Sequence, residues 1–311
     1  MTKDLKQLFL EYKDYCTYTS RLRPATIKGY SEAFKHFENL VPEVKIPDHL
    51  TTDKMSEFFK MLQTRTRVVG KGEKRVGVKD STVRTYWSKL NSFFEWLLTK
   101  NYIEINPLSS IKPPEPDYND RRALTGKEVH KILSAITLHS NAVLILKRDM
   151  LLVHILLFCG LRKGEVLGLE VRDIDIANRK ITIRSETTKS RKMREIPINQ
   201  TLLIHLIDYL SERKKYKTEK LVVSRNGDRG LSEGGLIHWV RKYKKLSGVN
   251  FHLHKFRHTF ACNLGTQNVS AIKVQKLMGH TDLRMTQRYL RSMTVDDLRD
   301  GINKLTVDTL V

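Results

Sequence analysis

A proline-rich segment divides this chain of 311 residues into two parts. It reads "NPLSSIKPPEPDYNDRR" (residues 106–122), contains four prolines and shows no hydrophobic periodicity. A segment of this kind is typical of an interdomain linker. The chain is also longer than one ordinary domain. We therefore expect one domain over residues 1–105, a linker over residues 106–122 and a second domain over residues 123–311.

The first part is predicted to be helical, because apolar residues recur in it at helical spacing. The stretch "RVVGKGEKRVGVKD" (67–80) interrupts this pattern and is rich in glycine and lysine, which indicates a flexible basic loop or a short hairpin. The expected helices are one over residues 3–18, one that begins near Pro24, one capped by Thr51 or Thr52, and one that begins at Asp80 or Ser81.

The second part is predicted to be mainly helical with one small sheet. Thr125 and Glu128 form a capping box that opens a helix, and the apolar run "MLLVHILLFCG" (150–160) indicates a buried core helix. The β-branched runs at 179–184 and 194–199 flank "SETTKSRKM", which indicates a hairpin. Further helices are expected over residues 199–212, 232–247, 254–267, 270–278, 282–291 and 295–304. The predicted fold is mainly α with a small β-sheet: a helical first domain followed by an α+β domain.

The net charge of +22 favours a polyanionic partner. Residues 1–120 carry 20 Lys and Arg against 16 Asp and Glu, so most of the excess lies in the second part. No segment places basic residues opposite a Trp/Phe/Leu face, as a membrane-surface helix would. Nucleic acid is therefore the favoured partner. The basic stretch 67–79 is either a solvated connector or an insertion that contacts DNA.

Cysteine usage, the N-terminal stretch and the most apolar run indicate a cytoplasmic protein without a membrane segment. The three cysteines are distant from one another and form no CxxC pair, which argues against disulfides and against a thiolate zinc site. The most apolar run is too short to span a bilayer, and "MTKDLKQLFLEY" contains acidic residues and no continuous apolar stretch of a targeting signal. No Walker-type loop and no ligand cluster with metal spacing is present, so we expect no cofactor.

Several residues could together act on a phosphodiester. Cleavage without a metal needs cations on the non-bridging oxygens, a general acid for the leaving oxygen and an activated nucleophile. The candidates are Arg162 with Glu165 one turn later in "GLRKGEVLGL", Lys189 on the predicted hairpin, His254 and Arg257 in "HKFRH", and His280 and Tyr289 in "GHTDLRMTQRYLRS". Each residue alone is more often a surface or core residue. Their order and neighbours together indicate a phosphate site.

This order resembles that of the tyrosine recombinase, or phage integrase, family. "GLRKGEVLGL" is similar to the first motif of the family, and "HKFRHTFACNLGTQNVSAIKVQKLMGHTDLRMTQRYL" is similar to the second almost position for position. The resemblance covers residues 121–291, and residues 1–105 resemble the helical core-binding domain more loosely. It departs from many relatives at Asn268, where they have glycine, and at Leu290-Arg291, where they have Thr-His.

The resemblance implies a role for each candidate. Arg162 and Arg257 would clamp the scissile phosphate, and His280 would hydrogen-bond it. His254 would assist proton removal from Tyr289, which would form a 3′-phosphotyrosyl bond. Lys189 would protonate the 5′-oxygen, with Lys192 as its rival. Because the phosphotyrosyl bond stores the energy of the broken phosphodiester bond, the resemblance implies that neither ATP nor metal is required. Possible phosphate contacts are Lys71, Lys74, Arg75, Arg191, Lys192, Arg241 and Lys242.

The resemblance also implies a homo-tetramer on two double-stranded DNA sites, with the C-terminal tail "VDDLRDGINKLTVDTLV" exchanged between protomers or packed on its own domain. The expected function is site-specific recombination near the nucleoid. The rivals are a type IB topoisomerase and a non-catalytic DNA-binding protein. Since the chain begins with the core-binding domain, we expect little room for an arm-binding domain. Integration or excision of a mobile element is favoured, and resolution of chromosome or plasmid dimers is the alternative.

Overall fold

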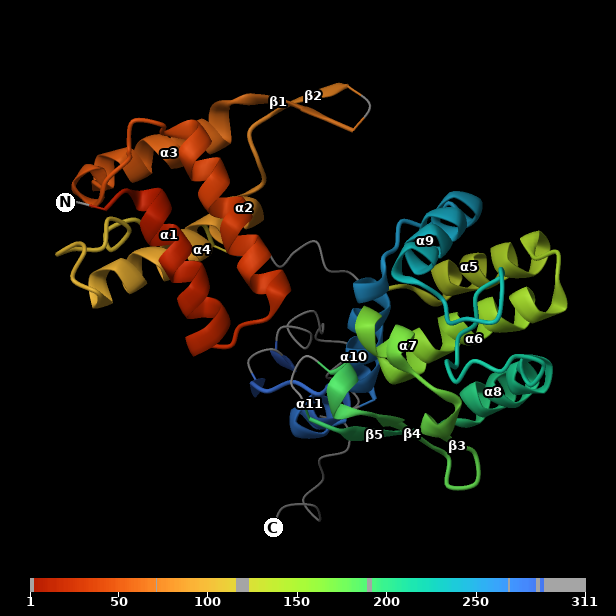
Figure 1. Cartoon of the computed structure of the whole chain (residues 1–311). Helices are drawn as coiled ribbons and strands as arrows, with labels where there is room; N and C mark the ends of the chain where they lie inside the picture. The colour runs from red at the N-terminus through yellow and green to blue at the C-terminus, as the bar shows by residue number, and fades with distance from the viewer. Residues whose placement is uncertain are drawn as a thin grey trace, which may run out of the picture. The chain divides into compact units, whose positions relative to one another are not determined.

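A computed structural model describes residues 3–70, 72–115, 123–188, 192–267, 269–283 and 286–287 of the chain. The chain divides into two compact units, Met1–Asp117 and Tyr118–Val311 (Figure 1). Most of the described residues are helical, and the described strands form two small antiparallel sheets. This confirms the predicted fold class. No described helix combines the length and the apolar character that crossing a bilayer requires.

The first unit packs its helices around an aromatic core. Phe9 stacks on Phe34 with 4.0 Å between ring centroids, and Phe93 meets both rings edge-on. Offset and edge-to-face pairs of this kind add to the free energy of burial. Its helices are α1 Leu5–Asp14, α2 Pro24–Leu40, α3 Thr52–Thr64 and α4 Asp80–Thr99, with a short 3-10 turn at Pro47–His49. The predicted starts at Pro24, after Thr51 and at Asp80 are confirmed.

The first predicted helix is shorter than expected. The α-helical part ends at Asp14, and Tyr15–Thr19 form a π-helical turn instead of continuing to residue 18. The Thr17 hydroxyl donates to the Lys13 carbonyl at 2.7 Å, and the Ser20 N–H bonds the Tyr15 carbonyl at 2.9 Å. Threonine and tyrosine are poor α-helix formers, and a hydroxyl that binds a backbone carbonyl competes with the helical ladder.

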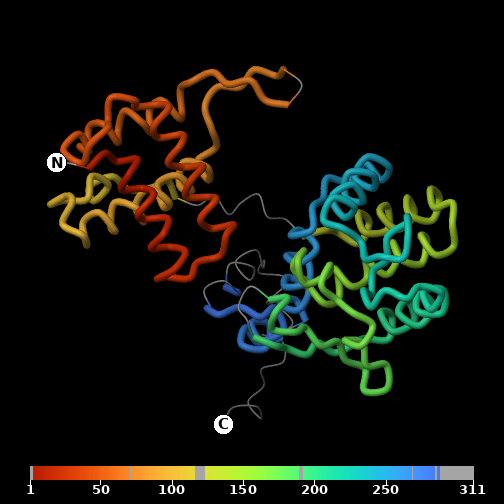
Figure 2. The backbone as a smooth tube through the Cα atoms, viewed as in Figure 1, coloured from red at the N-terminus to blue at the C-terminus, as the bar shows by residue number. Residues whose placement is uncertain are grey.

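The basic stretch after α3 is a hairpin. Strand β1 (Thr66–Val69) pairs with β2 (Glu73–Val76) in an antiparallel register that sets Val68 opposite Lys74. The hairpin extends away from the helices of its unit, as the backbone tube shows (Figure 2). All four residues of β2 are exposed. Of the two conformations that the sequence left open, a flexible loop and a short hairpin, the structure shows the hairpin.

Part of the proline-rich segment packs onto the first unit. Leu108 is fully buried in the aromatic core, and the Trp87 indole N–H donates to the Ile111 carbonyl at 2.8 Å. Arg84 donates to the Pro114 carbonyl at 2.8 Å. The apolar side chains between the prolines therefore order residues 106–114 against α4, and this stretch is less free than a linker would be.

The second unit is built around helix α6 (Val143–Cys159), which is buried along nearly its whole length and contains the predicted core run. Helices α5, α8 and α10 pack against it (Figure 1). The remaining helices are α5 Gly126–His139, α7 Lys163–Gly168, α8 Gln200–Arg213, α9 Glu233–Ser247, α10 Leu253–Thr266 and α11 Ala271–Met278. The Thr125–Glu128 capping box is present. Of the helix predicted over 282–291, residues 282–283 and 286–287 are described, and residues 283, 286 and 287 are helical. The helix predicted over 295–304 lies outside the described residues.

The sheet of the second unit has three strands in the order β3-β4-β5: Ile174–Asp175, Lys180–Ile183 and Arg194–Pro197. The predicted hairpin is formed by β4 and β5, which pair Ile181 with Ile196. Strand β3 was not predicted, since two residues carry no periodic signal. Residues Ser185–Thr187 after β4 form a 3-10 turn, and the predicted hairpin tip at 189–191 lies outside the described residues.

Candidate active site

Three arginines converge on the turn that ends helix α11. The Leu277 carbonyl accepts from Arg194 Nε at 2.8 Å, the Met278 carbonyl from Arg257 Nη2 at 2.6 Å, and the Gly279 carbonyl from Arg162 Nη2 at 3.3 Å. These three carbonyls belong to the last turn of α11 and the residue after it, where a helix leaves acceptors without internal partners and carries partial negative charge. The three-arginine turn, residues 277–279, is therefore the structural centre of the site.

Gly279 makes this turn possible. Its φ of +62° is left-handed and ends α11, and the His280 N–H then returns to the Gln275 carbonyl at 3.1 Å. A glycine reaches this conformation without steric cost. A Cβ at this position would also lie 3.0 Å from Arg194 Nη1. The sequence Gly-His therefore sets His280 directly after a closely packed turn.

Arg162 is placed by the start of helix α7. It occupies the N-cap of that helix, and Glu165 accepts from the Arg162 backbone N–H at 2.9 Å and from its Nη1 at 3.0 Å. The Arg162 side chain is about one quarter exposed, whereas the Glu165 side chain is buried. The predicted role of Glu165 as the residue that orients the guanidinium agrees with these contacts.

Arg257 and His254 are placed by helix α10 and line the same cavity. Arg257 is fully buried and donates to the Gly160 carbonyl at 2.6 Å in addition to the Met278 carbonyl. His254, one turn earlier, is exposed. This cavity has a volume of about 480 Å³ and is also lined by Arg162 and Arg241. A second cavity of about 670 Å³, the β5–α11 cavity, is lined by Arg194 and His280. The candidate cations Arg162 and Arg257 therefore meet in the cavity beside α10.

His280 is held as a neutral imidazole. Burial of the ring, together with the positive charges of Arg257 and Arg162, lowers the pKa of His280 to about 3. Its Nε2 lies 2.9 Å from Arg257 Nη2, and its Nδ1 lies 2.8 Å from Thr286 Oγ1. Because a guanidinium can only donate, Nε2 is the acceptor and Nδ1 carries the proton.

Arg194 was not predicted as a site residue. It begins strand β5, and its guanidinium binds the Glu165 carboxylate through two bonds, Nη1 to Oε1 at 3.1 Å and Nη2 to Oε2 at 2.8 Å. The sequence did contain a signal. Arg194 alternates with Ile196 and Ile198 in "REIPI", so strand periodicity places it on the buried face. A buried arginine requires a partner, and here the partner is Glu165.

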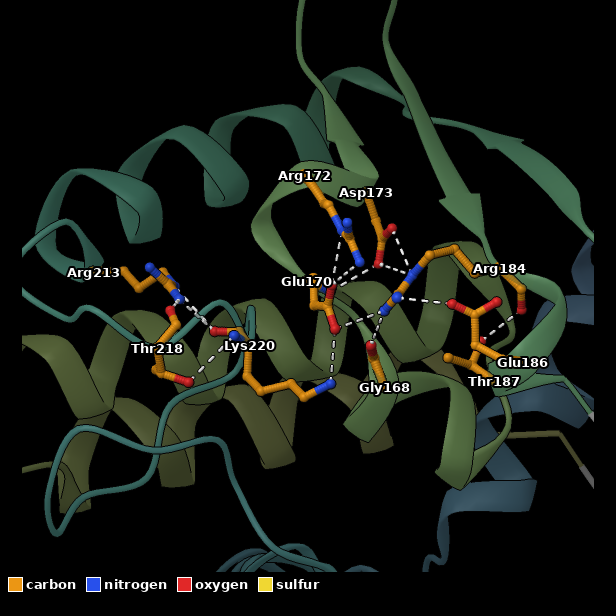
Figure 3. A network of polar contacts seen from close by, with 10 residues as sticks. All are labelled: Gly168, Glu170, Arg172, Asp173, Arg184, Glu186, Thr187, Arg213, Thr218 and Lys220. Carbon is orange, nitrogen blue, oxygen red and sulfur yellow. Dashed lines mark hydrogen bonds and ion pairs between the residues drawn. The ribbon is translucent and has the colours of Figure 1, made fainter.

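A polar network holds the other strand at the same end of this hairpin, since Arg194 is the register partner of Ile183, the last residue of β4. Arg184, directly after β4, pairs with Glu170 at 3.0 Å and with Asp173 at 3.0 Å, and donates to the Gly168 carbonyl at 2.8 Å (Figure 3). Lys220 adds a second cation to Glu170 at 3.0 Å. Glu170 and Asp173 are buried. Strand β4 is thereby attached to the C-terminal end of α7, while Arg194 attaches β5 to its first turn.

This network predicts a stability loss in acid. The hydrogen bond from Lys220 lowers the pKa of Glu170 to about 2, below the ordinary value near 4.5. A carboxylate with a lowered pKa stabilises the fold above its unfolded pKa, and this contribution disappears as pH falls from about 4.5 towards 2. We expect the melting temperature of Glu170→Gln to be below that of wild type at pH 7 and to fall less between pH 5 and pH 3. Thermal unfolding at four pH values measures this.

The control for that measurement is Glu186→Gln. Glu186 binds the same arginine at 3.0 Å, but its side chain is 63% exposed. Exposed ion pairs contribute little to stability, so this variant should follow the wild-type pH dependence closely. Equal pH dependence of Glu170→Gln and wild type would contradict the stabilising role of Glu170.

The other predicted residues are distributed unevenly. Lys192 is exposed and lines the β5–α11 cavity with Arg194 and His280. Lys242 instead lies over the Tyr243 ring at 4.7 Å and faces a separate cavity near Asp149. Lys74 and Arg75 lie on β2 of the first unit, where Arg75 pairs with Glu73 at 2.9 Å. Lys71, Lys189, Arg191 and Tyr289 lie outside the described residues. Within the described part, no group of three or more His, Cys, Asp or Glu could hold a metal ion.

Known protein families match both units. Residues 122–294 match the phage integrase family, and residues 8–104 match the N-terminal SAM-like domain of phage integrases. The chain belongs to the phage integrase family. It is therefore a tyrosine recombinase, an enzyme of site-specific recombination, which confirms the family predicted from the two motifs.

Relatives of this recombinase agree in sequence and in fold. The tyrosine recombinase XerC of Serratia marcescens is 26% identical over 279 residues, covering 88% of this chain and 86% of the relative. The Tn1549 transposon integrase, solved with transposon right-end DNA, shares the fold with a TM-score of 0.76 at 20% identity, covering 98% and 99% of the two chains. A lambda integrase dimer bound to a core site has a TM-score of 0.72 at 18% identity, covering 98% and 81%.

Proposed function

We propose that this recombinase cleaves and rejoins double-stranded DNA through a covalent bond between Tyr289 and a 3′-phosphate. The convergence of Arg162 and Arg257 with a neutral His280 around one turn carries the proposal. Two guanidinium groups from different elements can contact the two non-bridging oxygens of a phosphodiester, and neither loses its charge at any working pH. Preorganised cations of this kind supply most of the catalysis in phosphoryl transfer.

Each step of the proposed reaction forms one ester bond at phosphorus and breaks another. The Tyr289 oxygen attacks phosphorus and loses its proton with assistance from His254, while the bond from phosphorus to the 5′-oxygen breaks. Lys189 gives a proton to that oxygen, with Lys192 as the alternative donor. The second DNA strand then attacks the phosphotyrosine through its own 5′-hydroxyl, which releases Tyr289. Because phosphodiester bonds are only exchanged, the proposed reaction consumes no nucleotide.

The arriving phosphate would change the partners of His280. In the structure, Arg257 Nη2 donates to His280 Nε2, so this nitrogen has no proton to offer a phosphate oxygen. A phosphate oxygen is a stronger acceptor for Arg257 than a neutral imidazole is. We propose that the phosphate takes over this donor and that its negative charge allows a proton on Nε2, which then hydrogen-bonds the phosphate.

Covalent trapping tests the proposed function. The wild-type chain is incubated with lightly nicked fragments of genomic DNA from its own host, and adducts that survive denaturation are recovered and sequenced. A nick near the cleavage position lets a short fragment leave and prevents rejoining. We expect an adduct that 5′→3′ exonuclease degrades and 3′→5′ exonuclease does not. The most frequent sequence, the trapped duplex, then serves as the substrate for every variant below.

Tyr289→Phe is the decisive variant in that experiment. It removes the attacking oxygen alone, so it should bind the trapped duplex and form no adduct. An adduct of equal yield from Tyr289→Phe, or none from wild type, would overturn the proposal in favour of a DNA-binding protein without catalysis. Relaxation of a single-site plasmid without recombinant products would indicate a type IB topoisomerase instead.

The first unit is proposed to hold the DNA beside the cleavage site, with the β1–β2 hairpin as a contact. Two-stranded ribbons fit a DNA groove, and cations on them neutralise phosphates. Arg67 is paired with Arg75, and Lys74 is paired with Val68, the residue after Arg67. Arg67 and Lys74 therefore lie on opposite faces of the hairpin. The double variant Lys74→Ala/Arg75→Ala should weaken binding of the trapped duplex at low salt by about tenfold and reduce the salt dependence of binding. Mobility shifts at several salt concentrations measure both quantities.

A matched control for the hairpin is Lys3→Ala/Lys54→Ala. These two lysines of the same unit are both held in ion pairs with glutamates and lie outside the hairpin. Removing them changes the net charge by the same amount. If both double variants weaken binding equally, the hairpin acts only through net charge and makes no direct contact.

The assembly and the biological role are the finer parts of the proposal. We propose that four protomers act on two sites, because exchange between duplexes requires one nucleophile for each of four strands. Light scattering of the protein with the trapped duplex tests this number. Integration or excision of a mobile element is favoured by the hairpin, and resolution of dimers of the Xer type is the alternative. Trapped sequences at element ends support the first, and a single chromosomal site supports the second. Either role implies a cytoplasmic, nucleoid-associated protein.

A further inference from the structure

We propose that Arg194 is a positioning residue for DNA cleavage, which holds Arg162 and the turn before His280 in one fixed geometry by binding Glu165 and the Leu277 carbonyl together. This inference rests on the proposed function. Arg194 Nε binds the Leu277 carbonyl, and its Nη1 and Nη2 bind the Glu165 carboxylate, so all three nitrogens are engaged by protein groups. Its effect on cleavage would therefore pass through the residues that it binds.

The contacts of Arg194 close a ring through the site. Arg194 binds Glu165, Glu165 binds Arg162, and Arg162 donates to the Gly279 carbonyl. Arg194 Nε completes the ring at the Leu277 carbonyl, two residues before Gly279. These contacts connect strand β5 to helices α7 and α11. Because each side chain in the ring is bonded at both ends, it has few alternative rotamers. A displacement of any one of the three elements would move Arg162 relative to His280.

Arg194 also determines how much positive charge Arg162 can offer. The buried Glu165 carboxylate accepts four hydrogen bonds, two from Arg162 and two from Arg194. Burial opposes ionisation of this carboxylate, but the Arg194 guanidinium overcomes that effect and lowers the pKa of Glu165. With Arg194 present, the negative charge of Glu165 has its own counter-ion. Without Arg194, Glu165 would neutralise Arg162, and the phosphate would lose one cation of its clamp.

The charge compensation of Glu165 by Arg194 can be tested by comparing a single substitution with a double substitution that removes both charges. Arg194→Met leaves Glu165 with Arg162 as its only strong partner, whereas Glu165→Gln/Arg194→Met removes both charges. Removing one partner of a buried ion pair is more damaging than replacing both. If Arg194 acts by compensating Glu165, the double variant should cleave faster than Arg194→Met alone. If Arg194 only fills space, the double variant should be as slow or slower.

The experiment measures the single-turnover rate of adduct formation on the trapped duplex beside the equilibrium binding of the same duplex. For Arg194→Met we expect the rate to fall about 10- to 100-fold, as for other residues that orient a reacting group, with binding changed by less than about threefold. The double variant should recover at least about threefold of the lost rate. Circular dichroism and melting temperature establish that each variant is folded.

Two further variants keep the test decisive. Arg194→Lys retains the charge but not the two-bonded fork, so it should fold and cleave more slowly than wild type. Arg213→Met removes another buried arginine of the same unit, which donates to the Lys220 carbonyl at 2.6 Å and to the Thr218 carbonyl, and has no contact with the site. It should lower the melting temperature and leave the cleavage rate of folded protein unchanged.

The outcomes separate this inference from the proposed function. Absence of an adduct with wild-type protein contradicts the proposed function itself. A wild-type adduct together with wild-type rates in folded Arg194→Met and Arg194→Lys overturns the inference alone. Equal losses of rate in Arg194→Met and Arg213→Met, or a double variant no faster than Arg194→Met, would show that Arg194 contributes only to folding.

Discussion

Arg257→Lys is expected to reduce the rate of covalent adduct formation about 1,000-fold. Arg257 uses its two terminal nitrogens for three partners: the Gly160 carbonyl, the Met278 carbonyl and His280 Nε2. A lysine ammonium is a single point charge and cannot bridge these groups with the planar geometry of a guanidinium. Loss of a preorganised donor to the phosphate costs about 100- to 1,000-fold in comparable sites, and the misplaced turn adds to this loss.

The measurement is a single-turnover time course on the trapped duplex at saturating protein. Arg148→Lys is the matched control, because Arg148 is also buried, binds the Val223 carbonyl at 3.0 Å and pairs with Asp149 away from the cavity that Arg257 lines. This control should lose stability and keep its cleavage rate. A rate for Arg257→Lys within tenfold of wild type would contradict a direct role of the guanidinium in the reaction.

Gly279→Ala is expected to reduce adduct formation by a factor of about 100. The methyl group would require a left-handed alanine, which costs about 1 kcal/mol, and would lie within 3.0–3.2 Å of three atoms of Arg194. Arg194 is held by Glu165 and the Leu277 carbonyl, so it cannot move aside without breaking one of them. The displaced turn would move the Gly279 carbonyl and His280 away from Arg162.

Gly248→Ala separates backbone strain from this contact. Gly248 ends helix α9 with a φ of +68°, close to that of Gly279, and a Cβ there would meet nothing within 4 Å. Both variants should lose a similar amount of stability from the left-handed backbone. Only Gly279→Ala should lose cleavage, measured per folded molecule. Similar cleavage rates for the two variants would show that the packing of Arg194 against the turn is unimportant.

The individual phosphate-binding candidates of the site were predictable from the sequence. Arg162, Arg257 and His280 were chosen from their motif neighbours, and the structure brings all three to one turn. Glu165 was predictable for a local reason, because a residue three positions after an N-cap can return to it. Secondary structure followed in the same way from capping residues and periodicity, as at Pro24 and Thr125.

The contacts that connect these side chains were not predictable. Backbone carbonyls carry no residue identity, so nothing in the letters "KLMG" indicates that three arginines will bind there. The Arg194–Glu165 pair joins residues 29 positions apart through tertiary packing, which periodicity can place on a buried face but cannot pair. Lys242 shows the same limit, because it was predicted as a phosphate contact but lies elsewhere. It neighbours Arg241 in sequence, but helical geometry sends it to the Tyr243 ring and away from the cavity that Arg241 lines.

The three-arginine turn lies late in the chain, so it is synthesised after the arginines that bind it. Arg162, Arg194 and Arg257 are all translated before their shared acceptors at residues 277–279. A nascent chain that stops short of this turn has its basic residues but no frame that holds them at one phosphate. Truncated products that lack this turn should therefore bind DNA through charge without holding Arg162, Arg194 and Arg257 in one fixed geometry.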